Sequence, residues 1–179
     1  KIPSDKFILF DTKSEIATFV EDEFHLVVKK EDGATGMRRW FENNPGAKGI
    51  VFVDPPCKDD SDWKIITDFL SGKQAVVLGT IFIIWYPVFA YTKPDRLIGK
   101  CRATGLPFLG IECIVDKSKA KPSQKLKGSG IIVLNSPLIN HFCDDLSILA
   151  KNLSDAMKSG DEEPQVRIHS SESNESLGG

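Results

Sequence analysis

The residues best suited to chemistry are Asp54, Pro55 and Pro56, which close and follow the apolar segment Gly49–Asp54. In open α/β sheets, ligands bind beyond the carboxyl ends of the strands, and a strand ending here places Asp54 at such a position. The two prolines fix φ and lack N–H donors, so the turn offers only oxygen acceptors. Acceptors on both hydrogens of a ring-bound amino group can hold it and free its lone pair for attack. The turn therefore predicts group transfer to an amine; a plain turn-forming aspartate is the structural alternative.

Short apolar segments alternate with longer amphipathic ones along the chain. This pattern predicts repeated βα units that build a largely parallel sheet covered on both faces. The expected strands are Phe7–Asp11, His25–Lys29, Gly49–Asp54, Thr80–Tyr86, Phe108–Val115 and Gly130–Asn135. The expected helices are Ser14–Phe24, Thr35–Asn43, Ser61–Gly72, Lys93–Thr104 and Ile139–Met157.

The C-terminal part departs from this alternation. The segment Asp116–Gly128 leaves no room for a packed helix before the next strand, which predicts an antiparallel hairpin at the end of the sheet. From Lys158 to Gly179 the chain is rich in Ser, Glu and Gly, and its few apolar residues cannot offset the entropy of ordering. We therefore expect a catalytic domain over residues 1–157 and a disordered tail over residues 158–179.

Composition limits the class of protein. The 179 residues fit one domain, and 41% hydrophobic with 27% charged residues fits a globular core. The 23 basic and 25 acidic residues give a net charge of −2, so a nucleic-acid partner would need a local basic patch. The four cysteines lack zinc-ligand spacing, and the apolar run Gly79–Ala90 is too short to cross a bilayer. We expect no metal and no membrane partner.

A set of short motifs runs through the chain in a fixed order. They are Lys30-Glu-Asp-Gly33, Gly49–Pro56, Trp85-Tyr86-Pro87, Ile111-Glu112, Gly128-Ser-Gly130 and Asn135-Ser136-Pro137. From about Phe7 to Leu153 this set resembles the bacterial large-subunit ribosomal RNA adenine-N6 methyltransferases, class I enzymes with an Asp-Pro-Pro-Tyr turn. The resemblance implies a Rossmann-like, mostly parallel sheet with a C-terminal antiparallel hairpin. It also implies S-adenosyl-L-methionine as cofactor, large-subunit ribosomal RNA as partner and methylation of an adenine N6 amine.

The resemblance assigns catalytic roles to the turn after Gly49–Asp54. Asp54 matches the residue that accepts a hydrogen bond from the target N6 and lies beside the cofactor. Pro55 supplies a second acceptor through its carbonyl, and Pro56 completes the stiff turn.

The resemblance also assigns a cofactor site. Asp32 and Gly33 match the turn that receives the adenine of the cofactor, with Asp32 accepting from its amino group. Asp11 matches an acidic residue that binds the ribose hydroxyls, where the family usually has Glu. Two hydroxyl donors suit the two oxygens of a carboxylate.

The chain differs from the family pattern in two places. Cys57 stands where the family has Tyr, which removes an aromatic surface for a flipped base. The family's first strand and glycine-rich turn, which hold the methionine part of the cofactor, have no counterpart before Phe7–Asp11. That strand lies between Phe7–Asp11 and Gly49–Asp54 in the family's sheet, so these two segments either pair directly or leave open edges. A non-catalytic methyltransferase-like module that binds RNA or protein is therefore the alternative to an enzyme.

Contacts with RNA could come from the loop after Phe108–Val115. Its lysines could bind phosphates, and a solvated loop is an equal alternative; they are Lys117, Lys119, Lys121, Lys125 and Lys127. The histidines His25, His141 and His169 show no ligand spacing and are interpreted as structural or surface residues. A cytoplasmic location is expected, an organelle remains an alternative, and the oligomeric state is open.

Overall fold

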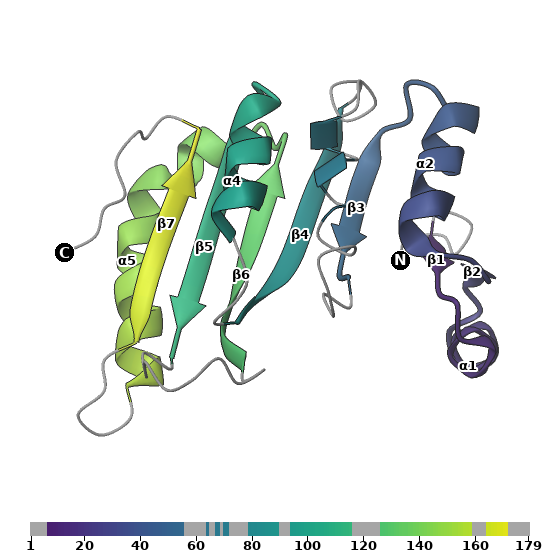
Figure 1. The fold of residues 1–179 in the computed structure, drawn as a ribbon, viewed down its shortest axis with the longest axis horizontal. Helices are drawn as coiled ribbons and strands as arrows, with labels where there is room; N and C mark the ends of the chain where they lie inside the picture. Colours follow the sequence, from purple (N-terminus) through teal and green to yellow (C-terminus); the bar gives the residue numbers. More distant parts are fainter. Residues whose placement is uncertain are drawn as a thin grey trace. The chain divides into compact units, whose positions relative to one another are not determined.

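The structure is a computed structural model that describes residues 7–55, 64, 67–68, 70–71, 79–89, 94–115, 126–158 and 164–171. In this part the chain has a mixed α/β fold with four helices and two sheets (Figure 1). It divides into two units, Lys1–Ala47 (unit 1) and Lys48–Gly179 (unit 2). The predicted α/β class is confirmed.

Unit 1 is one βαβ unit followed by a helix. Its elements are β1 (Ile8–Phe10), α1 (Ser14–Phe24), β2 (Val27–Lys29) and α2 (Gly33–Asn43). The strands β1 and β2 pair in parallel, with Phe10 opposite Lys29. His25 ends α1 in the left-handed conformation, with φ 54°. Gly36 is required for packing, because a side chain at this position would collide with the ring of Phe10.

Unit 2 contains a five-stranded sheet with the strand order β3-β4-β6-β5-β7. Its elements are β3 (Gly49–Val53), β4 (Thr80–Phe89), α4 (Pro94–Ala103), β5 (Phe108–Ile114), β6 (Leu126–Leu134), α5 (Ile139–Met157) and β7 (Gln165–Ser170). Figure 1 shows α4 and α5 on opposite faces of this sheet. Buried side chains of β4, β5 and β6 form its core, with Phe82, Ile84, Phe108, Ile132 and Leu134 among the most enclosed.

The helices agree well with the pattern of apolar residues. The observed bounds of α1 and α5 are those predicted, and α2 and α4 differ from the prediction by a few residues. Of the predicted helix Ser61–Gly72, the described residues are helical, and the others lie outside the described part. The strands β4 and β6 are longer than predicted because they pair with each other along most of their length, from Phe82 opposite Leu134 to Phe89 opposite Leu126.

The expectation of a largely parallel sheet is wrong for unit 2. Among the described strands, β3 and β4 pair in parallel, whereas the pairs β4–β6, β6–β5 and β5–β7 are antiparallel. The reason is that β6 lies between β4 and β5 and runs against both. β5 and β6 pair antiparallel. This pair does not end the sheet as predicted, because β7 pairs with the other edge of β5.

The prediction of a disordered tail is wrong for Gln165–Ser170, which forms β7. Val166 and Ile168 alternate with polar residues, the period of a strand with two different faces. This strand needs no core of its own, because it adds to the open edge of β5, and Ile168 packs against Leu109 and Ile139. Residues 172–179 lie outside the described part.

The segments Phe7–Asp11 and Gly49–Asp54 do not pair with each other in the described structure. β1 pairs with β2, and β3 pairs with β4, in separate sheets. Each of the two strands therefore has one edge without a partner among the described strands.

Candidate functional site

The turn after β3 lies where the sequence predicts it. β3 is a five-residue apolar strand that ends at Val53, and Asp54 follows as an exposed residue with half-buried Pro55 behind it. Val53 lies opposite Ile84 in the parallel pair, so Asp54 comes level with Trp85 while β4 continues to Phe89. Asp54 thus stands at the carboxyl edge of the sheet, accessible to a ligand. Pro56 and Cys57 lie outside the described residues.

In unit 1, Asp11 and Asp32 follow the carboxyl ends of two paired strands. Asp11 comes directly after β1, and its Oδ1 accepts a hydrogen bond from the backbone N–H of Lys13 at 2.7 Å. Asp32 caps α2, and its Oδ1 accepts from the N–H of Thr35 at 2.8 Å. Because β1 and β2 are parallel and in register, both aspartates lie at one edge of the small sheet. Each hydrogen bond uses one carboxylate oxygen, and the second can accept from a ligand.

Gly33 is the first residue of α2 and is exposed. A Cβ at this position would make an ordinary contact of 3.8 Å with Cβ of Phe10. Packing therefore demands glycine at Gly36 and not at Gly33. Packing gives no reason for glycine at Gly33. A ligand that approaches the backbone closely would give one.

The structure places the predicted site residues in two groups. Asp11, Asp32 and Gly33 belong to unit 1, and Asp54 and Pro55 belong to unit 2. Within each unit the predicted residues follow the carboxyl ends of the strands.

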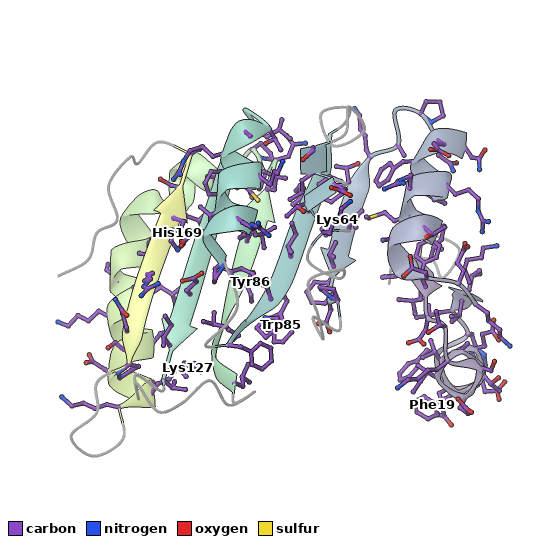
Figure 2. All side chains as sticks on the ribbon, viewed as in Figure 1. Phe19, Lys64, Trp85, Tyr86, Lys127 and His169 are labelled. Atoms are coloured by element: carbon purple, nitrogen blue, oxygen red, sulfur yellow. The ribbon has the colours of Figure 1, made fainter. Side chains whose placement is uncertain are left out.

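A buried polar cluster lies in the middle of the larger sheet, and the sequence analysis did not predict it. Glu112 of β5 is only 1% exposed, and Tyr86 of β4 donates its O–H to Glu112 Oε1 at 2.8 Å. Arg167 and His169 of β7 lie on the other side of this carboxylate, with Nη1 and Nε2 at 3.8 Å and 3.6 Å from Oε2. Figure 2 labels Tyr86 and His169, on β4 and β7.

One glycine makes this cluster possible. Tyr86, Gly130 and Glu112 lie opposite one another on β4, β6 and β5. A side chain at Gly130 would overlap the ring and hydroxyl of Tyr86. The glycine therefore lets the tyrosine cross β6 and reach the carboxylate. A tyrosine, a glycine and a glutamate inside three apolar strands were the available sequence signal.

The cluster controls two ionisation states. Burial alone would raise the pKa of Glu112, but the neighbouring His169, Tyr86 and Arg167 favour the carboxylate, and its pKa is lowered overall. Burial, followed by the charge of Glu112, raises the pKa of Tyr86 well above its ordinary value. At neutral pH the glutamate is therefore ionised and the tyrosine keeps its proton. Nε2 of His169 is buried and has no hydrogen-bond partner among the described residues.

The motif Asn135-Ser136-Pro137 also has a structural role. Asn135 follows β6 with φ 62°, a conformation that asparagine tolerates, and its Nδ2 donates to the carbonyl of Thr80 at 2.9 Å. Thr80 begins β4, so Asn135 lies at the edge of the sheet opposite to Asp54. This motif ties β6 to β4 and is remote from the carboxyl edge of unit 2.

The predicted RNA-binding lysines have one described member. Lys127 belongs to β6, and its carbonyl accepts a hydrogen bond from the N–H of Val115 at 2.9 Å. Its assignment to a loop is therefore wrong, because β6 begins at Leu126 to pair with β4 and β5. Lys117, Lys119, Lys121 and Lys125 lie outside the described residues.

The described residues contain neither a metal-binding group nor a membrane-spanning helix. No group of three or more His, Cys, Asp or Glu side chains there could hold a metal ion. No helix in that part of the chain is long and apolar enough to cross a membrane.

The chain is similar to a known protein family over most of its length. Residues 4–163 match the family model described as "Ribosomal RNA large subunit methyltransferase D, RlmJ". The chain belongs to the RlmJ family. The resemblance recognised from the motifs is thereby confirmed. No curated protein matches the chain.

A solved structure shares the fold of this RlmJ family member. It is the crystal structure of protein LPL1258 from Legionella pneumophila str. Philadelphia 1, assigned to the family model DUF519, with a TM-score of 0.71 and 18% sequence identity. The match covers 91% of the present chain and 60% of the Legionella protein. The chain therefore spans less than two thirds of that relative's length.

Proposed function

We propose that this chain takes part in S-adenosyl-L-methionine-dependent methylation of an adenine N6 amine in large-subunit ribosomal RNA. The observation that carries the proposal is the exposed Asp54-Pro55 turn at the carboxyl edge of β3, in a member of the RlmJ family. A family of ribosomal RNA methyltransferases supplies the reaction class, and the acceptor-only turn supplies the recognition of an amine.

Asp54 and Pro55 perform the substrate side of this reaction. The Asp54 carboxylate accepts from one N6 hydrogen and the Pro55 carbonyl accepts from the other, which orients the amine and directs its lone pair away from the turn. When bound, the cofactor supplies an electrophilic methyl group on a sulfonium. With its lone pair so directed, the amine would take the methyl group while the sulfonium left as a neutral thioether, and the Asp54 carboxylate or water would take up the N6 proton. Positioning of this kind accounts for large rate effects without a metal.

The residues of unit 1 fit the adenosine part of the cofactor. Asp32 and Asp11 each have one oxygen engaged with the backbone and a second oxygen to accept from an amino or hydroxyl group. Gly33 is exposed, and a backbone there can approach a ring closely. We propose that Asp32 and Gly33 receive the adenine and that Asp11 binds the ribose.

A second candidate function is a non-catalytic module that binds RNA or protein. Cys57 in place of an aromatic residue favours it, as do the open edges of β1 and β3 in the described structure. The enzyme proposal needs the family's first strand and glycine-rich turn, which hold the methionine part of the cofactor, in the protein that is assayed.

The test is transfer of labelled methyl groups from S-adenosyl-L-methionine to large-subunit ribosomal RNA, with N6-methyladenine identified in the digested product. We expect transfer by a version of the protein that carries the family's first strand and glycine-rich turn, and a loss of about a hundredfold or more in its Asp54→Ala variant. Asp155→Ala, an exposed aspartate on α5, is the matched control and should keep full activity. Equal activity of Asp54→Ala and wild type would refute the role of the turn. RNA binding without cofactor binding in calorimetry would favour the module.

A further inference from the structure

The strand β7 is attached to the sheet differently from its neighbours. None of its six residues is fully buried, whereas five of the seven residues of β5 are. Its Val166 and Ile168 are only partly buried, and Ile168 packs against the small cluster of Leu109 and Ile139. An edge strand with little buried apolar surface is the kind of element that opens locally while the rest of a protein stays folded.

Polar side chains add to the small apolar contact that holds β7 on the sheet. Arg167 lies opposite Glu112 and His169 lies opposite Gly110, so both basic side chains of β7 are on the face of the sheet that carries the Glu112 side chain. Oε1 of Glu112 is engaged by Tyr86, and Oε2 is turned towards Arg167 and His169. With β7 in place, the carboxylate faces the Arg167 guanidinium and the His169 imidazole and is almost completely enclosed.

Among the described residues, β4 and α4 stabilise the Glu112 carboxylate with the Tyr86 hydrogen bond and place no cation beside it. Tyr86 and Cys101 are neutral at physiological pH, because burial raises the pKa of both, that of Cys101 to about 12. Helix α4 also carries Asp95, which is acidic, and Arg102, whose guanidinium lies over the ring of Phe108 at 5.9 Å. A buried carboxylate needs partners that offset its charge, and here β7 brings the Arg167 guanidinium and the His169 imidazole to within 4 Å of Oε2.

We propose that β7 is a strap that opens and closes as a unit on the edge of β5, held closed by the carboxylate of Glu112 acting on Arg167 and His169. Opening frees the hydrogen-bonding edge of β5 from Leu109 to Ile114 and brings the Glu112 carboxylate to the surface. The strap is a conformational device of unit 2 and does not depend on the proposed methyl transfer.

Amide hydrogen exchange on the full 179-residue chain near neutral pH tests the strap. In the wild type, amides of β7 that bond to β5 should exchange at least about tenfold faster than amides of β4 and β6 in the same sheet. In Glu112→Gln, which keeps the size of the side chain and an acceptor for Tyr86, exchange in β7 should accelerate by about tenfold again while β4 and β6 stay protected.

If Glu112→Gln does not fold, a second variant and its control test the strap. Arg167→Gln changes a half-exposed side chain and should accelerate exchange in β7 selectively. Lys100→Gln removes a positive charge from an exposed position on α4 and should change nothing in β7. The proposal is overturned if β7 exchanges together with β4 and β6 in the wild type, or if neither charge-removing variant of the cluster accelerates β7.

Discussion

Two carboxylates of unit 2 follow the same rules of strand geometry and have opposite surroundings. Asp54 comes just after its strand, at the carboxyl edge of the sheet, and is exposed. Glu112 lies in the middle of its strand and is enclosed by side chains from β4 and β7. The comparison teaches that position along the strand separates an acid that can meet a ligand from an acid that holds the sheet together.

The largest expected effect on stability concerns the glycine that lets Tyr86 reach Glu112. Gly130→Ala should lower the free energy of unfolding by about 3 kcal/mol, the upper range for overpacking, because the new Cβ overlaps a buried ring flanked by other strands. Urea denaturation measures it. Gly99→Ala, at a helical glycine with open space around it, is the control and should stabilise slightly. A Gly130→Ala chain as stable as the wild type would mean that the cluster is not tightly packed.

A smaller loss is expected from the hydrogen bond itself. Tyr86→Phe removes the O–H that Glu112 Oε1 accepts and should cost about 2 kcal/mol, because the acceptor is charged and buried. Thermal and urea unfolding of the two proteins give the difference. An unchanged midpoint would show that the carboxylate gains nothing from the tyrosine.

Asp32, beside the small sheet of unit 1, combines the two roles that Asp54 and Glu112 have separately: it can meet a ligand and it stabilises the fold. Asp32→Ala should cost about 1 kcal/mol, because it removes the N-cap of α2, whereas Asp32→Asn or Asp32→Ser should restore most of the stability. Circular dichroism during urea unfolding reports the change. If Asp32→Ser regains stability but not cofactor binding, the aspartate has a role beyond capping. If Asp32→Ser regains both stability and cofactor binding, Asp32 acts only as the cap of α2.

The smallest expected effect is a loss of stability at acidic pH. The pKa of Glu112 is lowered in the folded chain, so its stabilisation is complete above the pKa of an unfolded glutamate, about 4.3, and is lost as the pH falls through the folded value. The free energy of unfolding of the wild type should therefore fall more steeply below about pH 4 than that of Glu112→Gln. Parallel pH profiles for the two proteins would contradict an ionised Glu112.

Local sequence was sufficient for much of the fold. The apolar periodicity of Ser14–Phe24 and Ile139–Met157 predicts both helices with their observed bounds, because amphipathic spacing is a local property. The strand Gln165–Ser170 was missed, because its order comes from the edge of β5, which lies far away in the sequence. The pairing of β6 between β4 and β5 is likewise non-local.

The candidate site was predicted in part for the same reason. Asp54, Asp11 and Asp32 follow strand ends, and a strand end can be recognised from the residues beside it. The partners of Glu112 come from two other segments of the chain, β4 and β7, so no local pattern reveals them. The motifs Trp85-Tyr86-Pro87 and Gly128-Ser-Gly130 include Tyr86 of this cluster and its glycine, Gly130, which gives both motifs a structural role in this chain.

The most direct test of the account is the amount of N6-methyladenine formed in large-subunit ribosomal RNA by Asp54→Asn, normalised to the folded fraction. Asparagine keeps the size of the side chain and one acceptor oxygen, and removes the negative charge that the amine faces as its nitrogen bonds to carbon. The account predicts a loss of about a hundredfold or more in methyl transfer with the urea midpoint of the wild type, because Asp54 is exposed and does not support the fold. Wild-type transfer by Asp54→Asn, or a loss fully explained by unfolding, would contradict it.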